Sequence, residues 1–599
     1  MYILILMFEL FYRKNDNSTL FNYLVKNGFE NPQNYIPIYS RFFDLDKNNY
    51  NNINLNNRYS INQITNRGNN NNFTIKVKDS KTDAIHSCES FFKFSPLLDP
   101  IKLMVGKYKD MDSSVVSSLP SISTDKCCKK VKDYNNSAYV DSFFSYLSSK
   151  LVNNSGFVHG TNFFGSFLSI QKEFQVNVYD DLEYLYDSPY FHKQNNSLFH
   201  LDEIDEKNLF SDTRNYRKKI SLDNTEDIVL DCETINDNIF EGMFKLTSEN
   251  LKIHENSIQE EYSIETNNKG NKSDKSAKKS DSTCSSRSSN TDDEDDEDDE
   301  DDEDDEDEED ESLSRNSNEY SDNSDEDSLS NSQMSEYSSM NTDNELINAS
   351  VFNFPIQIIC LEKLENTLDS LLDDEENELT DNEWKSCLFQ IIMMLITYQK
   401  IFNFTHNDLH TNNVMYVSTD KKFLNYKFNN TYYRVPTHGK IYKIIDFGRA
   451  IYSYKGKTIC SDSYHSKGDA ATQYNFEPYF DEKKPRLEAN KSFDLCRLGC
   501  SLFDYFIEDS EDQKNCKNPI AKLIIEWTKD DKGRNILYKK NGEERYPEFK
   551  LYKMIVRTVH AHTPEKQLDN PLFKNFVSSK KKIKKQKIIN IDNMSSMIM

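Results

Sequence analysis

The sequence predicts a mixed α+β chain, in which a small strand-rich part and a mainly helical part are interrupted by a long acidic insertion. Short strand patterns with turn residues recur before residue 195. Two strong helical patterns follow residue 380. Between the strand-rich part and the helical part, residues 255–345 have the composition of a disordered chain. Of the 599 residues, only 36% are hydrophobic, so we expect a sizeable core together with a substantial unfolded part.

The first expected elements are strands. Residues 58–64 and 73–78 read as a strand pair around an Asn-rich turn near Gly68. Residues 90–94 predict a short buried strand that ends at Pro96. These strands begin the small β-rich part of the fold.

A helix is expected over 138–152, followed by strand and turn over 156–170. Its apolar face is formed by Phe143, Leu147 and Leu151. Residues 1–55 are expected to be an N-terminal extension. The first eight residues are apolar but lack a basic region and a small-residue cleavage site, so we expect no secretory signal. No later run approaches a transmembrane length, and we expect a cytosolic chain without membrane contact.

The acidity of the chain is concentrated in one segment. Residues 292–311 are twenty consecutive Asp or Glu, so the remainder carries only −7 of the net charge of −27. General nucleic-acid affinity depends on Lys and Arg, and we expect no direct nucleic-acid binding. The run is interpreted as a solvated spacer, or alternatively as an arm that attracts basic proteins such as histones or packaging factors. The eleven cysteines contain no C-x-x-C pair, which is typical of free thiols in a reducing compartment.

Ordered sequence is expected to resume at the apolar run 353–362, which predicts a buried strand. Residues 380–383 form a capping box, and apolar residues then repeat at helical spacing to residue 398. Residues 441–445 predict a strand, and 492–507 predict a second amphipathic helix.

Two motifs in this second part carry chemistry. Residues 406–413 read H-N-D-L-H-T-N-N, which fits H-x-D-L-x-x-x-N, and residues 446–448 read D-F-G. Phosphoryl transfer from ATP needs a carboxylate near the acceptor hydroxyl and oxygen ligands for magnesium. Asp408, Asn413 and Asp446 supply one such set. In this order the motifs resemble those of the eukaryotic protein-kinase-like superfamily.

This resemblance implies a bilobal fold, with a small β-rich N-lobe and a mainly helical C-lobe. Asp408 would accept a proton from the attacking hydroxyl, and Asn413 and Asp446 would hold Mg²⁺. His406 would pack beneath the loop. In the string D-L-C-R-L-G, the buried carboxylate of Asp494 would bind the backbone of the catalytic loop and fix its shape.

The resemblance also implies a nucleotide site in the N-lobe. Lys93 is the candidate to pair with the ATP phosphates, because it stands in a strand in the manner of V-A-I-K. The expected helix offers no Glu as its partner, only the shorter Asp141, and no G-x-G-x-x-G precedes Lys93. The hinge falls at 361–364, where Glu362 and Leu364 would meet adenine through their backbone groups.

The expected organisation follows from these assignments. It comprises an N-terminal extension (1–55), the first part of the N-lobe (56–195), a low-complexity acidic insertion (196–350), an N-lobe strand with the hinge (351–365), the C-lobe (366–577) and a basic tail (578–599).

His410 departs from the common pattern, because most protein kinases have Lys there. The H-x-D-L-H form resembles haspin-type kinases and also aminoglycoside or choline phosphotransferases. A His is only partly charged near neutral pH, so this position leaves the acceptor class open. No A-P-E occurs, and Phe476-Glu477-Pro478 is the nearest string. The long separation between the two motifs implies an extra exposed loop around 418–438.

Three functions remain open. The first is an active serine/threonine protein kinase that uses ATP and Mg²⁺ on a protein substrate. The second is a small-molecule phosphotransferase, favoured by His410 and the missing A-P-E. The third is a pseudokinase, favoured by the absent glycine loop and helix Glu. Retention of Asp408, Asn413 and Asp446 opposes the third.

The whole pattern resembles divergent serine/threonine protein kinases of giant DNA viruses, through the catalytic loop and the strings at 94–100 (F-S-P-L-L-D-P) and 444–450 (I-I-D-F-G-R-A). This resemblance implies a location in the host cytoplasm or the virion. The six lysines between 580 and 587 are interpreted as a frayed charged terminus. The alternatives are a nuclear localisation signal or a contact with the acidic arm.

Overall fold

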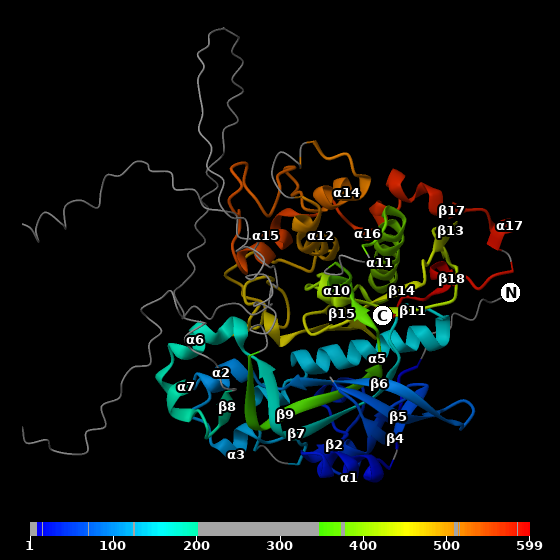
Figure 1. Ribbon diagram of the computed structural model, residues 1–599. Coiled ribbons are helices and arrows are strands. Elements are labelled where there is room, and N and C mark those ends of the chain that lie inside the picture. The colour runs from blue at the N-terminus through cyan, green and yellow to red at the C-terminus, as the bar shows by residue number, and fades with distance from the viewer. Residues whose placement is uncertain are drawn as a thin grey trace, which may run out of the picture. The chain divides into compact units, whose positions relative to one another are not determined.

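The computed structural model describes residues 9–201 and 347–599, apart from positions 15, 70, 124–125, 373–377, 508–512, 514 and 584. The acidic run 292–311 and the expected disorder over 255–345 lie outside the described residues. The described chain is a mixed α+β structure, strand-rich before residue 202 and mainly helical after residue 380 (Figure 1). All described residues belong to one compact unit of the chain.

A seven-stranded antiparallel sheet dominates the strand-rich part, in the order β2-β7-β9-β6-β5-β4 with β8 paired to β9. Its strands are β2 (Phe29–Gln33), β4 (Tyr59–Arg67), β5 (Asn72–Asp79), β6 (Ile85–Pro96), β7 (Phe163–Asn177), β8 (Phe199–Leu201) and β9 (Asn348–Glu362). The strand pair expected around Gly68 is confirmed as β4 and β5. Strand β9, coloured green in Figure 1, returns from beyond residue 346 to lie between β6 and β7.

Two helices cover the faces of this sheet. Helix α1 (Ser18–Lys26) contacts β2 and β4, whereas α5 (Ser137–Ser155) contacts β7 and β9 (Figure 1). In β9, residues 354–360 are all buried; they are apolar except for Gln357, whose side-chain amide donates to Ser166 Oγ. Helix α1 and β2 fall in the segment 1–55, which we expected to be an extension, yet both take part in this layer.

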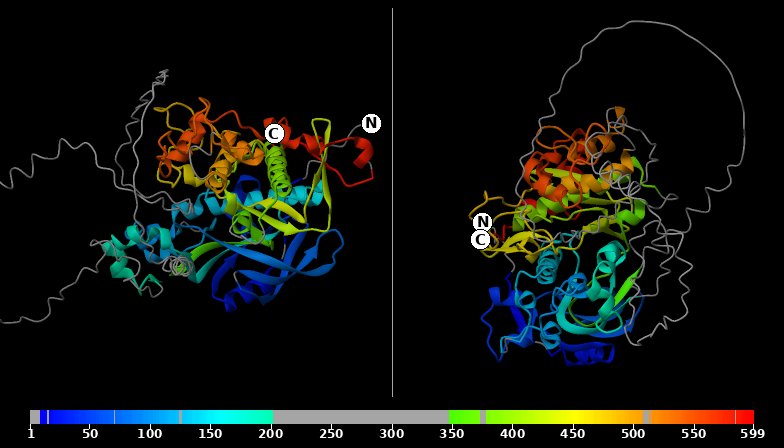
Figure 2. Two further views of the ribbon diagram at one scale, coloured as in Figure 1. Left: turned by 45° about the horizontal axis from the view of Figure 1, so that its top comes forward. Right: turned by 90° about the vertical axis from the view of Figure 1, so that its left-hand side faces the viewer.

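Helix α5 is buried on every side, from Ala138 to Leu151. Its sequence predicted a single apolar face, and the structure differs because α5 lies between the sheet and the helical part (Figures 1 and 2). Its Phe144 ring lies 4.4 Å from that of Phe404 and 4.8 Å from that of Tyr452. The Asn136 side chain caps the helix start by accepting from the Ala138 N–H, and Gly156 at φ 66° ends it.

The helical part is organised around α11 (Asp381–Phe402). The predicted capping box is confirmed, since Thr380 and Glu383 exchange side-chain to backbone hydrogen bonds. The other helices of this part are α10 (Leu368–Leu372), α12 (Phe493–Phe506), α14 (Pro519–Trp527), α15 (Lys550–Thr558) and α16 (Pro564–Gln567). Two small sheets accompany them, formed by β10 (Asn366–Thr367), β11 (Val414–Ser418) and β14 (Lys440–Ile444), and by β15 (Ile451–Tyr454) and β16 (Lys457–Cys460).

The extra loop expected around 418–438 is wrong in part, because the structure has a β-hairpin there. Strands β12 (Phe423–Phe428) and β13 (Thr431–Pro436) are joined by Asn429 and Asn430, both at positive φ. Two residues at positive φ suit the tight turns that match the twist of a hairpin, and Asn tolerates that conformation. The signal for this hairpin was the alternation of apolar residues on both sides of Asn-Asn, at Leu424, Tyr426 and Phe428 and then at Tyr433 and Val435.

The C-terminal segment completes the hairpin's sheet instead of fraying. Strands β17 (Val577–Ser578) and β18 (Ile589–Asn590) lie at the two edges, in the order β17-β13-β12-β18. Its apolar residues Ile589, Ile591, Met594 and Met597 are buried. The lysines between 580 and 587 predicted a frayed terminus, but the buried apolar residues that follow them hold this segment against the rest of the chain.

The remaining short elements are β1 (Tyr12–Lys14), β3 (Ile53–Leu55), α2 (Pro100–Met104), α3 (Ser113–Val116), α4 (Lys129–Lys132), α6 (Leu182–Tyr186), α7 (Pro189–Gln194) and α17 (Lys580–Ile583). None of the helices in the described ranges combines the length and the hydropathy needed to span a bilayer.

Candidate functional site

The loop that carries the first motif, residues 405–413, follows α11 and is held from below by a buried carboxylate. Asp494, at the start of α12, accepts hydrogen bonds from the His406 N–H at 2.9 Å and from the Asn407 N–H at 2.9 Å. Asp494 is fully buried, and burial raises the pKa of its carboxyl group. The contact expected between Asp494 and the backbone of this loop is therefore confirmed.

Side chains of the loop reach the segment that carries the second motif. The His406 imidazole is buried, with Nε2 lying 2.9 Å from the Ile445 carbonyl, and Nδ1 accepts from the Asp408 N–H at 3.3 Å. The Asn407 amide donates to the Arg449 carbonyl at 3.0 Å. These bonds fix the loop against the D-F-G segment, and the packing role expected for His406 is confirmed.

Asp408 and Asn413 lie on the same loop and are joined through it. The Asn413 amide nitrogen donates to the Asp408 carbonyl at 2.9 Å and lies 3.1 Å from His410 Nε2. Burial raises the pKa of Asp408, but the guanidinium groups of Arg449 and Arg497 help to lower it overall. Asp408 is therefore ionised near neutral pH.

His410 is neutral near neutral pH, in contrast to the partial charge expected from its type. Burial lowers its pKa to about 4, and this effect exceeds the attraction of Asp408 for a charged imidazole. The cations that face Asp408 are instead Arg449 and Arg497.

Three residues that are far apart in the chain meet at a second cluster. Lys93 of β6 lies with Nζ 2.7 Å from Asp141 Oδ2 of α5 and 2.8 Å from Asp446 Oδ1, just after β14. The Phe447 N–H donates to Asp141 Oδ1 at 3.0 Å. The structure thus joins the candidate lysine to Asp141, the shorter carboxylate that the expected helix offered.

The pKa values of the two carboxyl groups in this cluster depend on burial and on the neighbouring charges. Partial burial raises the pKa of Asp446, but the effect of the Lys93 ammonium is larger and holds that pKa well below its usual range. Burial, with a contribution from Asp446, raises the pKa of Asp141. The Asp446 side chain is 45% exposed, so a ligand from solvent can reach it.

Aromatic packing ties the second motif to α5. The Phe447 ring lies 4.6 Å from Phe144 of α5 and 5.7 Å from His406. Asp446 itself adopts φ 60°. A non-glycine residue at positive φ costs about 1–2 kcal/mol, and such residues concentrate at functional sites.

The expected hinge residues are held within the fold. The Glu362 carboxylate pairs with Lys443 Nζ at 2.9 Å and accepts from the Asn162 N–H at 2.9 Å. The Glu362 N–H donates to the Asn162 carbonyl at 2.9 Å, and Leu364 is buried. Since the Glu362 amide already has a protein partner, a contact with adenine would fall to neighbouring backbone groups.

Sequence reasoning missed several residues that surround the loop. Two of them lie in 468–474: Asp469 Oδ2 pairs with Arg449 Nη2 at 2.7 Å, and the Tyr474 hydroxyl donates to Asn407 Oδ1 at 2.6 Å. The Tyr552 hydroxyl of α15 donates to Asp408 Oδ1 at 2.9 Å. No local pattern marks these residues, because each contact joins segments distant in the chain.

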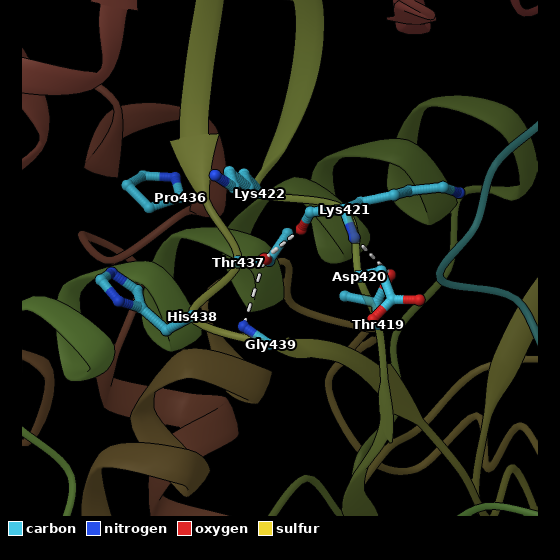
Figure 3. A pocket seen from close by; sticks show the side chains of 8 residues that line it. All are labelled: Thr419, Asp420, Lys421, Lys422, Pro436, Thr437, His438 and Gly439. Atoms are coloured by element: carbon cyan, nitrogen blue, oxygen red, sulfur yellow. Dashed lines mark hydrogen bonds between the residues drawn. The ribbon is translucent and has the colours of Figure 1, made fainter.

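A surface pocket lies elsewhere, among the turns that join β11 to β12 and β13 to β14 (Figure 3). It is lined by Thr419, Asp420, Lys421, Lys422, Pro436, Thr437, His438 and Gly439. Its hydrogen bonds are internal to the turns, such as Gly439 N–H to Thr437 Oγ1 at 3.3 Å (Figure 3). It contains none of the predicted site residues.

Comparison with known proteins gives distant and partial similarity to kinases. No family model matches the chain. A probable serine/threonine-protein kinase of Dictyostelium discoideum is 34% identical over 119 residues, which cover 18% of this chain and 9% of that protein. A probable kinase of Invertebrate iridescent virus 3 is 30% identical over 102 residues, covering 17% of this chain and 19% of that protein. The chain therefore spans less than a fifth of either relative, and the similarity indicates a kinase-like protein.

Proposed function

We propose that this chain transfers the γ-phosphoryl group of Mg-ATP to serine or threonine hydroxyls of protein substrates. The observation that carries the proposal is the meeting of Lys93, Asp141 and Asp446 beside the loop of Asp408 and Asn413. Positioning and charge stabilisation are most of what phosphoryl transfer requires of a protein. On this proposal, the sheet with α5 is the N-lobe and the helical part is the C-lobe of a bilobal kinase fold.

Lys93 and Asp446 form the nucleotide end of the proposed site. Lys93 would bind phosphate oxygens while Asp141 holds its ammonium in place. Asp446 is ionised and accessible, and with the amide oxygen of Asn413 it offers the hard oxygen ligands that Mg²⁺ prefers. When bound, ATP supplies the phosphoryl group, and Mg²⁺ neutralises the negative charge of the phosphates.

The β4–β5 turn would cover the phosphates in place of a glycine-rich loop. It contains one glycine, Gly68, whose N–H donates to the Asn72 carbonyl at 2.7 Å and closes the turn. The backbone of 361–364 would carry the adenine contact.

Asp408 forms the acceptor end. Its low pKa keeps it ionised, so it can accept a hydrogen bond from a serine or threonine hydroxyl and orient the attacking oxygen. His410 is neutral and brings no charge to the transferred phosphate. Arg449 and Arg497 are the cations near this end of the site.

A second candidate is a pseudokinase that binds partners without chemistry. It is favoured by the burial of Asp408, which is 7% exposed and accepts a hydrogen bond from Tyr552. Two further expectations stay proposals. One is that the acidic run 292–311 binds basic proteins, and the other is a location in the host cytoplasm, the virion or the nucleus.

The test is phosphoryl transfer by the purified full chain. It is incubated with γ-labelled ATP and Mg²⁺, alone and with casein or histones, beside Asp446→Ala and the surface control Asp420→Ala. Label should enter protein with the native chain and D420A, and fall by orders of magnitude with D446A, because a metal ligand is lost. Absence of label from the native chain, or equal label from D446A, would refute the proposed function.

A further inference from the structure

Helix α15 places a tyrosine directly on the carboxylate of the catalytic loop. The Tyr552 hydroxyl donates to Asp408 Oδ1 at 2.9 Å, and the same hydroxyl oxygen accepts from Arg497 Nε at 2.9 Å. Tyr552 is 5% exposed. The hydroxyl is therefore fixed between a guanidinium and the carboxylate.

The ring of Tyr552 is held as firmly as its hydroxyl. It stacks on Phe549 at 5.3 Å and lies 6.0 Å from Phe493 of α12. The guanidinium carbons of Arg449 and Arg497 lie 5.6 and 5.2 Å from its centroid. These contacts explain how a single helix of nine residues can keep Asp408 covered.

An acceptor for phosphoryl transfer must present a hydroxyl group to this same carboxylate, which is only 7% exposed. A general base works on a hydroxyl within about 2.6–3.2 Å, and the Tyr552 hydroxyl lies within that range of Asp408. The two hydroxyls cannot occupy one position on the carboxylate.

We propose that Tyr552 is an occluding residue, whose hydroxyl fills the acceptor position at Asp408 until α15 moves it aside. The proposal rests on the proposed function, because it concerns the acceptor end of that site. In the closed state Asp408 bonds to Tyr552; in the open state the ring swings away with α15 and an acceptor hydroxyl takes its place. The apparent affinity for an acceptor is then the affinity of the open state multiplied by the fraction of molecules that are open.

Replacing Tyr552 with Phe tests this competition with little change to packing. Phe keeps the ring but cannot donate to Asp408, so the closed state loses a hydrogen bond to a charged group. We expect kcat/KM for the protein acceptor to rise about tenfold, which corresponds to about 1.4 kcal/mol. The rise should appear as a lower acceptor KM, with KM for ATP unchanged.

Tyr538→Phe is the matched control. The Tyr538 hydroxyl donates to Asp504 at 2.8 Å, so this variant also removes a tyrosine–carboxylate bond. Asp504 lies ten residues beyond Asp494 on α12, about 15 Å further along the helix axis. Y538F should have the acceptor KM of the native chain.

A second variant keeps the test independent of one substitution. Phe549→Leu removes the ring stacked on Tyr552 and leaves the hydroxyl in place. Like Y552F, it should lower the acceptor KM, but by a smaller factor. Thermal melting of each variant checks that it is folded.

The outcomes separate the two proposals. Transfer by the native chain with no gain in Y552F, or with a loss, would overturn the occluding role alone and assign Tyr552 to positioning Asp408. Absence of transfer by the native chain, Y552F and F549L alike would overturn the proposed function and this inference with it. Weak but measurable transfer by the native chain, raised about tenfold in Y552F, would support both.

Discussion

Replacing Asp494 with Ala removes the carboxylate that holds the loop 405–413 in place. In the native chain this carboxylate accepts from the backbone N–H groups of His406 and Asn407. Both residues are fully buried, so water cannot replace the lost acceptor without opening the structure. The variant therefore leaves two buried donors without their partner.

The magnitude follows from the two lost bonds. A buried donor left unsatisfied costs about 1–3 kcal/mol, so two of them cost about 2–6 kcal/mol. Part of this is offset, because burial of the Asp494 carboxylate is itself unfavourable, as its raised pKa indicates. We expect the free energy of unfolding to fall by about 3 kcal/mol, and by about half as much in Asp494→Asn, which keeps one acceptor oxygen.

Two assays check this expectation. Urea unfolding gives the loss in free energy, and hydrogen exchange followed by mass spectrometry reports the amides of His406 and Asn407. Asp504→Ala is the control on the same helix, because its carboxylate is exposed and binds the Tyr538 hydroxyl. If D494A loses no more stability than D504A, and the two amides stay protected, the Asp494 carboxylate does not stabilise this loop.

Two further predictions concern His159 and the C-terminal segment. Burial lowers the pKa of His159 to about 4, so the folded chain stays neutral there while the unfolded chain binds a proton below pH 6.5. Stability is therefore lost as the pH falls, by about 2 kcal/mol between pH 7 and 5 for this one group. His410 contributes in the same direction, so His159→Gln should make the dependence of the urea midpoint on pH shallower without abolishing it; an unchanged dependence would contradict the assignment. Deleting 589–599 should lower the free energy of unfolding by at least about 3 kcal/mol in the same assay, because each buried Ile or Met contributes about 1.5–3 kcal/mol. A loss below about 1 kcal/mol would mean that this segment is not part of the core.

Local patterns predicted the elements whose signals lie within one stretch of chain. The capping box at Thr380, the strand pair around Gly68 and the support of the loop by Asp494 were all expected. Each depends on spacing or on a motif of a few residues. The loop 405–413 and the D-F-G segment also carry motifs of a few residues, and their catalytic role stays a prediction.

The elements that sequence reasoning missed depend on long-range contacts. Tyr552 meets Asp408 across 144 positions of the chain, and Tyr474 meets Asn407 across 67 positions. The C-terminal strand β18 pairs with β12, although its lysine-rich flank suggested a frayed end. Charge dominated that interpretation, whereas burial of a few apolar residues decides the outcome.

The place of β9 in the sheet has a consequence for the order in which the chain is made. β6 and β7 emerge from the ribosome with open edges, because the strand that separates them begins only at Asn348. At about 5–20 residues per second, the roughly 145 residues between β8 and β9 delay that strand by about 7–30 s. Unpaired apolar edges recruit other chains, so the newborn N-terminal part depends on chaperones or on its own helices α1 and α5 for that interval. A fragment that stops before residue 348 would keep this exposed edge permanently.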